Sequence, residues 1–135
     1  MNNQIRWLKI AFLAGIITDA LALIPMLYPP IAKLMWGFDK FSDNYFFAMG
    51  YGASLMTGWT LVLIWAYKRP LERRSIAVLT IIVILGLVVT EIFAVANGSI
   101  NINKMIPTWI LQIVLLELFG FSYVITHKIS KEQQE

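Results

Sequence analysis

Residues 76–96 read IAVLTIIVILGLVVTEIFAVA, an apolar run that contains a single charged side chain, Glu91. A hydrocarbon core of about 30 Å needs about 20 mostly apolar residues in a helix, so this run is long enough to cross a bilayer. The run is continuous rather than alternating, and it exceeds the length of a membrane β-strand. It therefore predicts a transmembrane helix.

Three further runs of the same kind, residues 10–28, 45–67 and 106–126, make four in all. The chain has 135 residues, of which 59% are hydrophobic and 14% charged, against about 45–50% and about 25% in typical globular proteins. So short a chain cannot hide that much apolar surface from water. We expect an all-α integral membrane protein of the cell membrane. Residues 1–135 would form one domain, a four-helix transmembrane bundle with the lipid bilayer as its partner.

Lys and Arg residues are distributed unequally between the two sides of this bundle. The loops after the first and third runs hold only Lys33, Lys40 and Lys104, and the other eight of the 11 lie in the tails and in the middle loop. Because cytoplasmic segments carry an excess of Lys and Arg, both termini are predicted to be cytoplasmic. The net charge of +3 is then explained by topology, and no nucleic-acid partner is expected.

The segment between the first two runs, residues 29–44, carries an apolar helical pattern. Ile31, Leu34, Met35 and Phe38 follow helical spacing, which predicts a short amphipathic helix on the outer membrane surface. The alternative is a loop folded over the end of the bundle. At the other end of the chain, residues 130–135 are expected to form a polar tail.

Acidic side chains inside the runs are the first candidates for a functional site. Asp19 and Glu117 lie near the centres of the first and fourth runs, and Glu91 lies about 7–8 Å outside the centre of the third. Gln112 is expected at the height of Glu91. Each acid costs about 2.5–3.5 kcal/mol at mid-membrane on insertion scales. No run contains Lys, Arg or His, so their natural partners are one another, Gln112, hydroxyl groups and water.

These acids have a structural interpretation and a functional one. Protonated acids can hydrogen-bond helices together, but such bonds average about 0.6 kcal/mol and do not offset the insertion cost. A substrate-binding or ion-binding role for Asp19, Glu91, Glu117 and Gln112 is therefore favoured. Trp59, near the centre of the second run, could stack on a flat substrate or bind a cation through its ring. The more ordinary interpretation is that its ring fills the bundle.

Small residues also recur in the second run. Gly50, Ser54 and Gly58 are spaced by four, a pattern that lets helix backbones approach closely, either within the chain or between copies. The chain has no cysteine and a single histidine, His127, so no metal site or cofactor is expected.

Three functions are compatible with these features. The favoured one is a transporter or channel for protons, cations or a cationic solute. Because four helices leave little lumen, it would be a homo-oligomer with its path at a subunit interface. An alternative is a membrane enzyme or binder for an apolar lipid or isoprenoid, with the carboxylates as acid and base. The other is an accessory subunit whose acids pair with basic residues of another protein. The catalytic residues of any enzyme remain unassigned.

Overall fold

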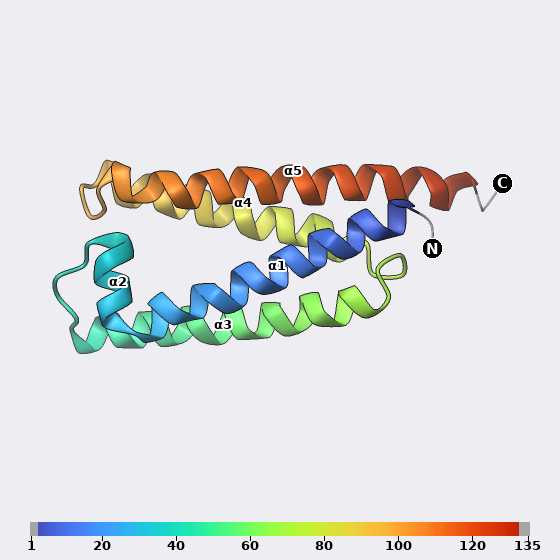
Figure 1. Ribbon diagram of the computed structural model, residues 1–135. Helices are drawn as coiled ribbons and strands as arrows, with labels where there is room; N and C mark the ends of the chain where they lie inside the picture. The colour runs from blue at the N-terminus through green and yellow to red at the C-terminus, as the bar shows by residue number, and fades with distance from the viewer. Residues whose placement is uncertain (1–2, 133–135) are drawn as a thin grey trace.

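The computed structural model describes residues 3–132, and this part of the chain is entirely α-helices and connecting loops (Figure 1). Four of the five helices are long and apolar enough to cross a membrane. This confirms the all-α class and the presence of four long apolar helices at the predicted runs, while membrane insertion and orientation stay predictions. The helices are α1 (Asn3–Leu27), α2 (Pro29–Trp36), α3 (Asp43–Lys68), α4 (Ser75–Ala96) and α5 (Ile102–Glu132).

The helices extend beyond the predicted spans at several ends. Ser42 caps α3, since its Oγ accepts a hydrogen bond from the backbone N–H of Tyr45 at 3.3 Å. Pro107 lies inside α5 rather than in the first turn of a helix, and its missing N–H leaves the carbonyl of Asn103 without its usual partner. Of the expected polar tail, residues 130–132 continue α5 and residues 133–135 lie outside the described part.

Helix α1 crosses between α3 and α5, and α4 packs mainly on α5 (Figure 1). Contacts between α3 and α4 are few, so the packing order α3–α1–α5–α4 does not close evenly into a ring. The start of α1, the α3–α4 loop and the end of α5 lie together at what we call the termini end. Helix α2 and the α4–α5 loop lie at the opposite end, the α2 end.

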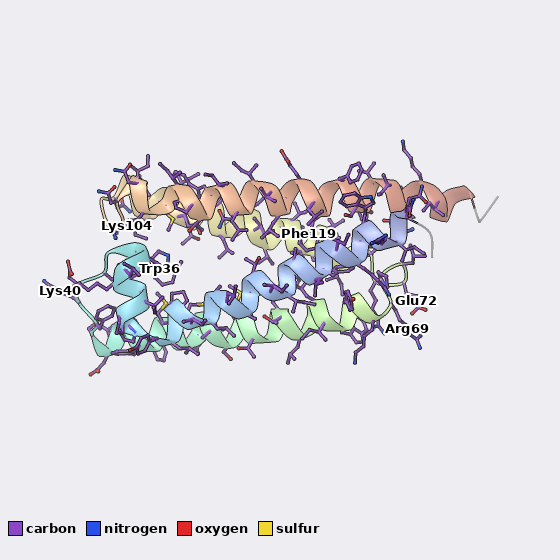
Figure 2. The ribbon with its side chains drawn as sticks, viewed as in Figure 1. Trp36, Lys40, Arg69, Glu72, Lys104 and Phe119 are labelled. Carbon is purple, nitrogen blue, oxygen red and sulfur yellow. The ribbon has the colours of Figure 1, made fainter. Side chains whose placement is uncertain are left out.

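The short helix expected between the first two spans is α2, and it folds over the α2 end. It ends at Gly37, whose φ of 77° is in the left-handed region that glycine adopts without strain. Helix α2 contacts both α1 and α5, and Lys104 at the start of α5 donates a hydrogen bond to the Leu34 carbonyl at 2.9 Å. Figure 2 shows Lys104 beside α2. Of the two expected placements, these contacts favour the one over the bundle end.

The tight core lies mainly in the half of the bundle nearest the termini end. The Phe12 and Phe119 rings meet edge to face with centroids 5.9 Å apart, and Figure 2 shows Phe119 between α5 and α1. Gly15 and Leu63 complete what we call the closed layer. The buried cluster as a whole is Leu8, Ala11, Phe12, Leu63, Ala66, Ile76, Ala77, Ile84, Leu115 and Phe119.

Candidate functional site

Glu91 of α4 accepts hydrogen bonds from two side chains of α5. Trp109 Nε1 donates to one carboxylate oxygen at 3.0 Å, and Gln112 Nε2 donates to the other at 2.9 Å. Trp109 and Gln112 are three residues apart, so they share one face of α5. The Gln112 side chain is buried, with 7% of its surface exposed. The carboxylate thus ties α4 to α5 in the half of the bundle nearest the α2 end.

Helical periodicity explains why these two side chains meet. Glu91 follows the buried Ile84 by seven residues, which is close to two turns, and therefore lies on the same face of α4. Gln112 precedes the buried Phe119 by seven residues and shares its face of α5. Both residues therefore extend the inward-facing stripes of their helices from the closed layer towards the α2 end.

Asp19 lies on the inward-facing stripe of α1. It follows Phe12 by seven residues and Gly15 by four, which places it one turn, or about 6 Å, from the closed layer towards the α2 end. Its side chain is partly buried. No hydrogen bond or ion pair joins Asp19 to another residue of the described chain. Asp19 differs in this respect from Glu91, which has two donors.

Trp59 of α3 lies at the same level as Asp19. It precedes Leu63 by four residues on a helix that runs opposite to α1, so it too is one turn from the closed layer towards the α2 end. Trp59 packs against the buried cluster, and its indole N–H is buried without a hydrogen-bond partner among the described residues. Because nearly all buried polar groups are hydrogen-bonded, an unpaired indole N–H points to a water or a ligand group beside it.

A third polar group in this half of the bundle also lacks a partner. Gln112 Oε1 is buried and unpaired in the described structure. Its amide is oriented by Glu91: the nitrogen must face the carboxylate, so the oxygen faces away from it. Gln112 lies about 10 Å, or two turns, from the closed layer, only about 4 Å further along the bundle than Asp19. We call Asp19, Trp59, Glu91, Trp109 and Gln112 the interior polar site.

The chemistry of this site is that of a hydrogen-bond acceptor. Asp19 offers a carboxylate without a partner, Gln112 offers an amide oxygen, and Trp59 offers the electron-rich face of an indole ring. These groups complement a positive charge, since carboxylates and amide oxygens attract cations and indole is the side-chain ring that binds them best. The indole N–H of Trp59 can in turn donate to a carboxylate or a water.

Glu117 lies apart from the interior polar site. It is five residues beyond Gln112, about 140° around α5, and its side chain is exposed. The neighbours on that face, Ile113, Val114 and Phe121, are exposed as well. Of the expected partners of the acids, Gln112 is found at Glu91, whereas no side-chain hydrogen bond or ion pair joins any two of the three acids in the described structure. The side of α5 that carries Glu117 faces away from the bundle.

The small residues of α3 are also on an exposed face. Gly50, Ser54 and Gly58 are all exposed, and a β-carbon on either glycine would meet no other atom within 4 Å. They do not pack against another helix of this chain, and a role between copies stays a prediction. The close approaches of glycines to a neighbouring helix are instead at Gly15, where a β-carbon would lie 3.1 Å from Leu63 Cδ1, and at Gly52, where it would lie 2.6 Å from Met26 Cε. The sequence signal for the approach at Gly15 is the spacing of Ala11 and Gly15, small residues four apart.

An apolar groove follows the seam between α4 and α5. Its volume is about 350 Å³, and it contains no acidic side chain. Elsewhere in the described chain, no group of three or more His, Cys, Asp or Glu residues is arranged to hold a metal ion. The groove is lined by Leu85, Val88, Ile92, Trp109, Gln112, Ile113 and Leu116.

Comparison with known proteins finds no matching family model, no similar curated protein and no similar solved structure. The residues of the interior polar site are therefore the basis for assigning a function to this chain.

Proposed function

We propose that this chain is a small membrane transporter that binds an organic cation at Asp19 and carries it across the bilayer. The observation that carries the proposal is that Asp19 faces the bundle interior, one turn from the closed layer, without a partner in the described chain. An acid inside a membrane protein is expensive, and such acids mark ion and substrate pathways. Glu91, by contrast, has two hydrogen-bond donors and supports the site structurally.

The neighbours of Asp19 support a cationic substrate. Trp59 lies at its level and Gln112 Oε1 lies further towards the α2 end, so an acid, an aromatic ring and an amide oxygen come from three helices. An ammonium or similar cation is the class of ligand that each of these three groups attracts. An aromatic ring contributes about 0.5–2 kcal/mol to such binding, depending on how far the cation is desolvated. A metal cation would favour more oxygen ligands than the site offers.

The distribution of packing supports transport rather than simple binding. On the termini side of Asp19 the bundle is closed by Phe12, Leu63 and Phe119 around Gly15. Buried polar atoms without a partner lie on both sides of this layer: Trp59 Nε1 and Gln112 Oε1 towards the α2 end, and Ser122 Oγ and His127 Nδ1 towards the termini end. The asymmetry is in the apolar packing, because most of the buried apolar cluster lies in the termini half, and a transporter needs a bundle that is closed towards one side of its site. By the charge distribution the closed layer would lie on the cytoplasmic side of Asp19, and the outer side would be the α2 end, which α2 covers in this structure.

The enzyme alternative receives less support from the geometry. The groove between α4 and α5 is the described cavity suited to an acyl or isoprenoid chain, and no carboxylate lines it. Acid–base catalysis needs a carboxyl group within hydrogen-bond reach of the reacting atoms. An apolar chain in this groove would therefore lack the catalytic groups that the enzyme interpretation requires.

A flux assay tests the proposal. The protein is reconstituted in liposomes, and uptake of the lipophilic cation tetraphenylphosphonium and movement of protons are followed in parallel. We expect tetraphenylphosphonium uptake above that of empty liposomes, and a drop of at least about tenfold in Asp19→Asn. Glu117→Gln is the matched control, because it neutralises an acid of similar depth that faces away from the site. Equal uptake by both variants would overturn the proposal, and movement of protons alone would overturn the substrate class.

A further inference from the structure

Glu117 is the central polar group of an otherwise apolar face of α5. The face points away from the buried residues of the helix, and its apolar members are each more than 40% exposed. They continue for about three turns before Glu117 and two turns after it, and one of them, Phe121, also meets the Trp7 ring of α1 edge to face with centroids 5.8 Å apart. They are Ile106, Ile110, Ile113, Val114, Phe121 and Val124.

A carboxyl group in this position needs a partner from outside the chain. No hydrogen bond or ion pair joins Glu117 to another described residue. In a monomer the group would face lipid near the middle of the bilayer, at an insertion cost of about 2.5–3.5 kcal/mol. Acids within membrane spans otherwise face the bundle interior or pair with one another. The α5 face is therefore covered in the assembled protein.

The geometry of the face favours a second copy of the same chain as the partner that covers it. Two copies inserted in the same direction are related by a twofold axis along the membrane normal, and such an axis keeps every residue at the depth of its counterpart. A pair of α5 helices thus brings Glu117 to Glu117. Two carboxyl groups that share a proton are complementary to each other, so their pairing lowers the cost of placing each of them in the membrane. A β-carbon at Gly120 would meet nothing within 4 Å, which lets a second helix approach closely beside Glu117.

We propose that a second copy of this chain covers the outer face of α5, with the two Glu117 carboxyl groups hydrogen-bonded to each other across a twofold axis. Each protomer keeps its own interior polar site on the opposite face of α5. This interface is therefore independent of the transport proposal, and either can fail without the other.

Cross-linking tests the contact. The chain has no native cysteine, so in a single-cysteine variant the introduced thiol is the only one that can form a disulfide. Val114→Cys lies on the proposed interface, and Val89→Cys on the outer side of α4 is a control of the same residue type and similar exposure, since the native side chains are 54% and 52% exposed. Under oxidation in dilute liposomes we expect a disulfide-linked dimer for Val114→Cys and monomer for Val89→Cys. Equal cross-linking of both, or none at Val114→Cys, would overturn the proposal.

Substitution of Glu117 separates the contribution of its carboxyl group to the stability of the dimer from the contribution of the apolar face. Energy transfer between labelled protomers is measured while the protein is diluted with lipid. Glu117→Leu should weaken the dimer by about tenfold, because the apolar face remains but the hydrogen bonds are lost. Glu117→Gln keeps a donor and an acceptor and should dimerise nearly as the native chain does. A Glu117→Leu dimer of native strength would overturn the proposal. So would a native chain that is monomeric on its own, as expected if another protein with a basic residue in its span covers the face.

Discussion

Phe119 of α5 packs directly against Gly15 of α1, where a β-carbon would lie 3.0 Å from Phe119 Cζ. This contact is on the same level as the approach of Leu63 from α3, so three helices meet at one glycine. The meeting point defines the closed layer. Asp19 follows it by a single turn towards the α2 end, so the acid lies directly beside this tight packing.

Enlarging Gly15 should destabilise the bundle. Gly15→Leu forces a branched side chain against Phe119 and Leu63, and such overpacking typically costs about 1–3 kcal/mol. Gly86→Leu on α4 is the matched control, because a β-carbon there would meet nothing within 4 Å. The free energy of unfolding of the two variants can be compared in mixed micelles. Equal destabilisation would show that the three helices do not meet at Gly15.

Removing the Glu91 carboxylate should also destabilise the protein. Glu91→Ala leaves Trp109 Nε1 and Gln112 Nε2 without an acceptor, and an unsatisfied buried donor costs about 1–3 kcal/mol. Thr90→Ala is the control, since the Thr90 hydroxyl is exposed and bonds only to the Gly86 carbonyl of its own helix. A double-mutant cycle of Glu91→Ala with Gln112→Ala should give a coupling of about 0.5–2 kcal/mol. Additive effects of the two substitutions on the free energy of unfolding would contradict a contact between Glu91 and Gln112.

The number of helices could be predicted from the sequence, but not the faces on which they pack. Continuous apolar runs identify spans by length alone, and Ser42 is a recognisable cap. Such runs are apolar on every side, however, so the periodicity that identifies the buried face of a soluble helix is absent. The outward position of Glu117 could not be read from its depth for this reason. The proximity of Gln112 to Glu91 could be anticipated, because height in the bilayer follows from residue number.

The bundle should admit water from the α2 side only as far as the closed layer. Ala22 lies one turn beyond Asp19 and is partly buried, whereas the buried Ala11 lies on the termini side of Gly15. A charged thiol reagent added from the α2 side should therefore modify Ala22→Cys and spare Ala11→Cys. The two variants make the same small change at alanines of one helix, so each serves as the control for the other. Modification of Ala11→Cys from that side would contradict a closed layer.

The orientation predicted from charge can be tested with the same chemistry. Ser99 lies in the α4–α5 loop at the α2 end, and Glu72 lies in the α3–α4 loop at the termini end. In intact cells an impermeant thiol reagent should label Ser99→Cys, and Glu72→Cys should be labelled only after the membrane is opened. The reverse pattern would invert the assignment of the closed side as cytoplasmic.

Competition for the carboxyl group of Asp19 tests whether the transported cation binds there. Dicyclohexylcarbodiimide is an apolar reagent that couples to carboxyl groups within membranes, and peptide mass spectrometry reports the extent of labelling at Asp19 and Glu117 separately. With the protein in liposomes, tetraphenylphosphonium should reduce labelling of Asp19 by at least about fivefold and leave labelling of Glu117 unchanged. Labelling of Asp19 that does not respond to the cation, or that falls in parallel with Glu117, would contradict the claim.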